Sequence, residues 1–220
     1  MRTYIVLDLE WNQSPVGKEG AVEAIPFEII EIGAVKLDEK LEYMSKFHEF
    51  ISPVVYNDIH HRIYELVHID INYLRDKGKK FLTVIDKFKQ WCYMDGQEPM
   101  FCTWGSMDLS ELQRNMAYHK QENFFEYPLF YYDIQKLFTL DRCDDPKERL
   151  PLEKAVRQLG LPIKGEFHHA LDDAYYTSLL LSKINFEALK VYKSLDLYRS
   201  PNSEEEEIYI KFPEYAKYVS

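Results

Sequence analysis

The segment TYIVLDLE, residues 3–10, is the feature that most constrains the fold of this chain. An apolar run of this length that leads directly into acidic residues is typical of a buried strand. Because side chains alternate between the two faces of a strand, Asp8 and Glu10 are expected on the same face. We therefore expect two neighbouring carboxylates at the carboxyl end of a strand in the core.

The remaining pattern predicts an α/β fold. Strands are expected over residues 3–9, 29–37, 43–51, 99–104 and 129–134, with a loop over residues 11–26. Helical periodicity is expected over residues 57–67, 81–93, 107–120, 150–159 and 170–184. Three strands in succession at the start of a chain are the opening of a ribonuclease H-like sheet. We therefore predict a ribonuclease H-like mixed five-stranded sheet flanked by helices.

Length and composition predict one main domain. A chain of 220 residues with 46% apolar residues can bury one sizeable core, and we place that domain at residues 1–184. Residues 185–220 differ in character, because a polar, acidic break separates a helical pattern from an aromatic end. We expect this tail to pack on its own domain, and a partner interface is the alternative.

Cysteine content and charge exclude several classes of protein. Three cysteines, Cys92, Cys102 and Cys143, are too few and too irregularly spaced for a disulfide framework or a zinc site, which favours the cytoplasm. The sequence shows no secretory leader and no apolar run of about 18 residues, so we expect no membrane segment. A net charge of −10 argues against a protein that coats long nucleic acid, since such binding depends on many basic side chains.

Three further residues complete a candidate catalytic set. Asp108 lies in TWGSMDLSEL at the start of a predicted helix, and HHALDDA places His168 before a helix whose first turns contain Asp173. Carboxylates held on rigid elements are suitable ligands for divalent cations, and a histidine has a pKa suited to accepting a proton from water. With Asp8 and Glu10, this set predicts a two-metal phosphodiesterase site.

The order and spacing of these motifs resemble the DEDDh family of 3′–5′ exonucleases. Its first motif, D-x-E at a strand end, is matched by Asp8 and Glu10, its second by Asp108, and its third, H-x4-D, by His168 and Asp173. The resemblance implies that the acidic residues hold two divalent cations, Mg²⁺ or Mn²⁺, and that His168 is the general base. It also implies hydrolysis of single-stranded RNA or DNA from a free 3′ end to 5′-mononucleotides.

The resemblance covers residues 1 to about 184, and residues 26–40 are similar to the second strand of the family. Within the family, the sequence is most similar in appearance to the branch of histone-mRNA exonucleases and sporulation regulators. A noncatalytic nucleic-acid-binding or regulatory module on the same fold is the alternative function. A structural protein that acts through its aromatic tail is a further alternative, because fold does not dictate function.

Three residues near the motifs have open roles. Asp172 adjoins Asp173, but successive helical residues point about 100° apart, so Asp172 is expected to cap or support the site. His169 is the less favoured alternative to His168 as base. Glu31 could support the site, although in IIEIG it is more simply a strand residue with a polar contact.

Overall fold

The structure is a computed structural model that describes residues 2–94, 96–121, 130–145, 148–185 and 195–196. Its strands are β1 Arg2–Gln13, β2 Phe27–Leu37, β3 Tyr43–Phe50, β4 Glu98–Thr103, β5 Phe130–Asp133 and β6 Leu195–Asp196. Its helices are the 3₁₀ turn η1 Gly17–Gly20, and α1 His61–Val67, α2 Ile71–Lys77, α3 Phe81–Tyr93, α4 Met107–Tyr118, α5 Ile134–Arg142, α6 Leu152–Gln158 and α7 Ala170–Leu181.

The strands form one mixed sheet in the order β3-β2-β1-β4-β5-β6. β2 pairs antiparallel with both β1 and β3, whereas β4 runs parallel to both β1 and β5. The predicted ribonuclease H-like sheet of five strands is confirmed. A short antiparallel strand, β6, adds two residues beyond β5. The rest of the predicted tail lies outside the described residues.

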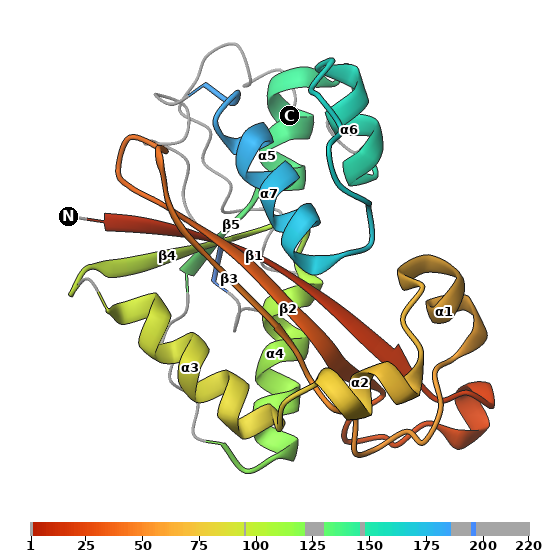
Figure 1. Cartoon of the computed structure of the whole chain (residues 1–220). Coiled ribbons are helices and arrows are strands. Elements are labelled where there is room, and N and C mark those ends of the chain that lie inside the picture. The colour runs from red at the N-terminus through yellow and green to blue at the C-terminus, as the bar shows by residue number, and fades with distance from the viewer. Residues whose placement is uncertain (1, 95, 122–129, 146–147, 186–194, 197–220) are drawn as a thin grey trace.

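Alternation along β1 separates two cores, one on each face of the sheet. Ile5 and Leu7 pack against α3 and α4, whereas Tyr4 and Val6 belong to a cluster with α5, α6 and α7. Figure 1 shows α3 and α4 on one side of the sheet and α5, α6 and α7 on the other. Since Asp8 and Glu10 continue the even-numbered series, they face the side of α7.

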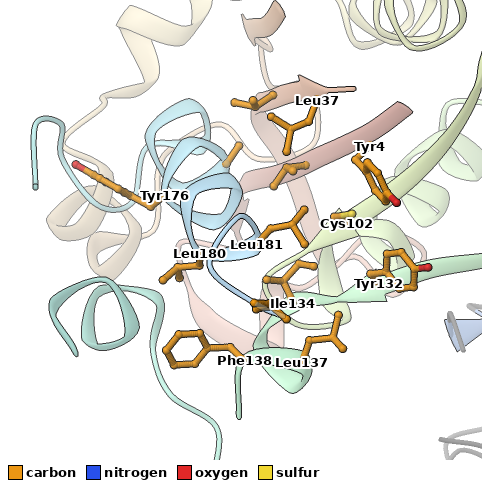
Figure 2. Close-up of a cluster of buried hydrophobic side chains, with 14 of the residues drawn as sticks. Tyr4, Leu37, Cys102, Tyr132, Ile134, Leu137, Phe138, Tyr176, Leu180 and Leu181 are labelled. Carbon is orange, nitrogen blue, oxygen red and sulfur yellow. The ribbon is translucent and has the colours of Figure 1, made fainter. Parts of the chain in front are cut away.

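Helix α7 is buried along much of its length. Figure 2 shows Tyr176, Leu180 and Leu181 of α7 in the same cluster as Leu37 and Cys102 from the strands. Burial of this kind contributes about 1.5–3 kcal/mol for each large apolar side chain. The helix is therefore fixed on the sheet, and so are the residues of its first turn.

The structure corrects three details of the predicted elements. β1 continues to Gln13 and does not end at residue 9, because β2 pairs with it through Gln13↔Phe27 after a bulge at Glu10/Trp11. The short helix α2 is an addition to the predicted elements. It begins where the Asp70 side chain accepts hydrogen bonds from the backbone amides of Asn72 and Tyr73. α5 is a second addition to the predicted elements. It follows β5 without a loop, and the last residue of β5, Asp133, caps it.

Among the described residues, no helix is both long and apolar enough to cross a membrane.

Candidate active site

Asp8 and Glu10 lie just beyond the point where β1 loses its parallel neighbour. The pairing of β1 with β4 ends at Val6↔Cys102, whereas the pairing with β2 continues on the other side. Both carboxylates are partly buried and belong to the face that α7 covers. The sequence predicts two carboxylates at the end of a strand, whereas the structure places them in the interior of a longer strand that continues to Gln13.

Asp108 approaches β1 where β4 no longer pairs with it. Its carboxylate Oδ1 accepts a hydrogen bond of 3.1 Å from the backbone N–H of Leu9. That amide would otherwise be a buried donor without a strand partner, which is costly. Asp108 thus satisfies the backbone of β1 and brings a second element, the first turn of α4, to the two β1 carboxylates.

The first turn of α7 reaches the site because Gly33 has no side chain. Gly33 lies opposite Asp8 in the β1–β2 pairing. A Cβ atom built on Gly33 would lie 2.1 Å from the carbonyl carbon of Ala170 and 2.1 Å from the amide nitrogen of Leu171. Only glycine permits this close approach of helix and strand backbones, and it brings Asp173 to the same face as Asp8.

His168 is on a loop that α7 holds by several contacts. Its backbone N–H donates to Oδ2 of Asp173 at 3.1 Å. The hydroxyl of Tyr176 accepts hydrogen bonds from the amides of Lys164 and Gly165 at 3.1 and 2.8 Å, and the Phe167 ring packs on the Tyr176 ring. His168 itself has a φ of 68°, a left-handed conformation that is uncommon for residues other than glycine. The loop therefore presents His168 in a constrained geometry.

Burial and mutual repulsion raise the pKa values of the four carboxyl groups. Desolvation is the largest cause for each, and it raises the pKa of Asp8 well above its usual range. The pKa of Glu10 rises to about 8, and those of Asp108 and Asp173 to about 7. Charge repulsion from Asp173 also raises the pKa values of the other three carboxyl groups. These groups are therefore close enough to oppose one another's ionisation.

The arrangement fits divalent cations. Ligand atoms of Glu10, His168 and Asp173 lie within 4.8 Å of one another. Oδ1 of Asp173 is buried and has no hydrogen-bond partner among the described residues. Carboxylates that repel each other, with one buried oxygen that has no donor, are suited to a hard divalent cation, which would offset their charge.

Comparisons with known proteins agree with this geometry. The model of the RNase T exonuclease family matches residues 5–181. The chain belongs to this exonuclease family. The resemblance to DEDDh-type exonucleases is thereby confirmed, and family membership implies the use of divalent metal. No curated protein sequence matches the chain.

Solved structures of exonucleases have the same fold. The nuclease domain of 3′hExo, a DEDDh family member bound to rAMP, is 19% identical with a TM-score of 0.69, covering 82% of this chain and 90% of that one. Cell-death related nuclease 4 is 23% identical with a TM-score of 0.66, covering 82% and 62%. E. coli exonuclease I in complex with a dT13 oligonucleotide is 15% identical with a TM-score of 0.61, covering 83% and 41%. At these identities the likeness shows the shared exonuclease fold.

The structure defines the contacts of Asp172, His169 and Glu31. Oδ2 of Asp172 accepts the backbone N–H of Glu166 at 3.1 Å, so Asp172 holds the loop before His168, in agreement with its expected supporting role. Nδ1 of His169 lies 3.8 Å from Oε2 of Glu31, on the side of β2. His48 also reaches this carboxylate, because its Nε2 is 2.7 Å from Oε1 of Glu31. No sequence signal identified that contact, because it depends on the pairing of β2 with β3.

Proposed function

We propose that this exonuclease-family protein is a metal-dependent 3′–5′ exonuclease that hydrolyses single-stranded RNA or DNA ends to 5′-mononucleotides. The observation that carries the proposal is the convergence of Asp8, Glu10, Asp108 and Asp173, whose pKa values are all raised, on one end of the sheet beside His168. The presence of residues that match all three family motifs also supports the proposal.

The acidic residues would hold two divalent cations, Mg²⁺ or Mn²⁺. When bound, such cations supply positive charge at the scissile phosphate and lower the pKa of water. Asp8 and Glu10 contribute from β1, Asp108 from α4 and Asp173 from α7. β1 is part of the sheet, and α4 and α7 pack on its opposite faces, so these three elements would hold the carboxylates at a fixed spacing.

His168 would accept the proton of the attacking water as general base. Desolvation is the largest cause that lowers the pKa of His168, although the residue is exposed at the surface. A lowered pKa keeps the imidazole neutral at neutral pH, which is the form that can accept a proton. The contacts from Asp173 and Tyr176 to its loop limit the positions that the ring can reach.

A short, single-stranded end is the substrate that the charge of the chain favours. The net charge of −10 does not suit extended contact with a phosphate backbone. Cations bound in the acidic cluster would reverse the local charge and attract phosphate at that point alone. Two of the similar structures contain bound rAMP and a bound dT13 oligonucleotide, so neither RNA nor DNA is favoured on this ground.

A matched set of oligonucleotides tests the proposal. Single-stranded RNA and DNA of one sequence, labelled at the 5′ end, are incubated with the protein and Mn²⁺. Each linear strand has either a 3′ hydroxyl or a 3′ phosphate, and a circle of the same sequence has an internal label. We expect a ladder that shortens from the 3′ hydroxyl end, little cleavage of the other forms, and no cleavage in EDTA or by Asp8→Asn.

Two results would contradict the proposal. Equal cleavage of a circular strand would show an endonuclease. Binding of the oligonucleotide with no cleavage in Mn²⁺ or Mg²⁺ would instead favour the noncatalytic nucleic-acid-binding module.

A further inference from the structure

Glu31 is a buried carboxylate on the same face of the sheet as the catalytic set. It lies directly opposite Glu10 in the β1–β2 pairing, and its side chain is only 1% exposed. Oε1 is 2.7 Å from Nε2 of His48 on β3, within hydrogen-bond distance. Oε2 is buried without a hydrogen-bond partner among the described residues. A buried carboxylate is costly unless a partner compensates it, so the position of Glu31 requires an explanation.

The imidazole of His169 lies near the unsatisfied oxygen. Its Nδ1 lies 3.8 Å from Oε2 of Glu31, and its Nε2 lies 3.6 Å from Oε2 of Glu166. His169 directly follows His168 and is the N-cap residue of α7. The Glu31 carboxylate therefore lies between an imidazole of β3 and an imidazole of the loop that presents His168.

Glu31 does not share the position of the metal-ligand candidates. The ligand atoms that gather within 4.8 Å belong to Glu10, His168 and Asp173. One oxygen of Glu31 is occupied by His48, and the other faces His169. Its negative charge nevertheless acts on the site, because it raises the pKa values of Asp8, Glu10 and Asp173.

We propose that Glu31 is a positioning residue that holds the His169 imidazole against β2 and thereby fixes the backbone that carries His168. The role of this contact in catalysis rests on the function proposed above. His48 orients the carboxylate from the opposite side, so that Oε2 is directed toward His169. The contact complements those from Asp173 and Tyr176, which hold the same loop from α7.

The kinetic test compares Glu31→Gln, His169→Gln and the double variant. The glutamine keeps the size of Glu31 but removes its charge. With saturating Mn²⁺ and an oligonucleotide with a free 3′ end, each single variant should lower kcat about 10- to 100-fold with KM little changed, since small misplacements of a catalytic group have effects of this size. The double variant should be no slower than the slower single one. Wild-type kcat in Glu31→Gln, or multiplied losses in the double variant, would overturn the proposal.

Glu111→Gln is the matched control. Glu111 is also buried, at 2% exposure, and its Oε2 likewise has no hydrogen-bond partner among the described residues. It lies on α4 and is absent from the causes that shift the pKa values of the four site carboxyls. We expect its kcat to equal that of the wild-type protein.

Amide hydrogen exchange in the metal-free protein provides a second measurement that needs no activity. Glu31→Gln and His169→Gln should both speed exchange at the His168 amide, whereas Glu111→Gln should not. Unchanged exchange at His168 would overturn the positioning role, even if the wild-type protein is an active nuclease. A wild-type protein without nuclease activity would defeat the proposed function alone. If Glu31→Gln fails to fold, His169→Gln carries the exchange test, because His169 is partly exposed.

Discussion

The Asp108 carboxylate accepts the backbone N–H of Leu9 at 3.1 Å, joining α4 to β1 across 99 positions of the sequence. The same side chain thus has a structural and a catalytic assignment, and these can be separated. Asp108→Asn keeps an oxygen acceptor for Leu9 but removes the charge. At pH 5, where the folded Asp108 carboxyl is protonated, we expect it to melt near the wild-type temperature. We also expect a loss of at least about 100-fold in kcat, since acid–base and electrostatic groups of a site contribute on this scale.

Asp108→Leu is the comparison for that prediction, because it removes the acceptor as well. A buried donor left without a partner costs about 1–3 kcal/mol, so the melting temperature of this variant should fall below that of Asp108→Asn. Equal melting temperatures of the two variants would show that the Leu9 contact does not stabilise the fold. Circular dichroism melts in EDTA are the measurement.

The acidic cluster predicts that the metal-free protein becomes less stable as pH rises. In the unfolded chain these carboxyls titrate near pH 4, whereas in the folded protein the pKa of Glu10 is about 8 and those of Asp108 and Asp173 are about 7. Between these limits the folded state binds more protons than the unfolded state. The free energy of unfolding therefore falls from about pH 4 to about pH 8.

Thermal melts in EDTA at pH 5, 6, 7 and 8 test this dependence. The melting temperature should decrease across the series in the wild-type protein, and less steeply in Asp8→Asn, which removes one of the repelling charges. At pH 8 the variant should melt several degrees higher, since about 1 kcal/mol corresponds to roughly 2–4 °C in a protein of this size. Added Mn²⁺ should stabilise the wild-type protein most at high pH. A rising or flat series in EDTA would contradict the repulsion.

His168 and Asp173 have different expected roles although they adjoin. His168→Ala should keep Mn²⁺ binding and lose about 10²- to 10⁴-fold in turnover, the range of general acid–base catalysis. Asp173→Ala should weaken Mn²⁺ binding itself. Calorimetric Mn²⁺ titration and single-turnover rates separate the two. Weak Mn²⁺ binding by His168→Ala would mean that His168 is a ligand, as its place beside Glu10 and Asp173 permits.

The hydroxyl of Tyr176 offers a test of the His168 loop that leaves the motif residues unchanged. Tyr176→Phe removes the acceptor for the amides of Lys164 and Gly165 but keeps the ring that contacts Phe167. We expect a several-fold lower kcat and unchanged Mn²⁺ affinity. Tyr175→Phe is the matched control, because Tyr175 is exposed, and it should behave as the wild-type protein. Equal rates of the two variants would show that the hydroxyl does not position the loop.

The close approach at Gly33 should not tolerate a side chain. Gly33→Ala places a methyl group where the backbone of Ala170 and Leu171 lies, so α7 must move away from β2. We expect lower thermal stability and loss of turnover through displacement of Asp173. Gly20→Ala is the control, because its Cβ would meet only the side chains of Val16 and Ser14, which can shift. Full activity of Gly33→Ala would contradict the close packing of α7 on Gly33.

Local patterns account for what the sequence predicted. Alternation along residues 3–10 placed Asp8 and Glu10 on one face, and helical spacing placed Asp173 in the first turn of α7. Both rules need only neighbouring residues. The motif order then allowed a candidate catalytic set to be named, and ligand atoms of three of its members, Glu10, His168 and Asp173, lie within 4.8 Å of one another.

The remaining features depend on contacts between distant segments. Glu31 faces Glu10 only because of the β1–β2 register, and His48 reaches Glu31 only because of the β2–β3 pairing. The extension of β1 to Gln13 likewise depends on its partner strand. Asp133 caps α5 with its own side chain, but that helix follows β5 directly, so no loop residues mark the boundary in the sequence.

The packing of α7 on Gly33 also determines when a newly made chain can form the proposed site. Asp8 and Glu10 leave the ribosome early, whereas Asp173 follows near the end of the domain and reaches the site only when its helix packs on β2. A partly synthesised chain therefore has no complete site. Translation through α7 and its packing on β2 must therefore both be complete before the proposed site can form.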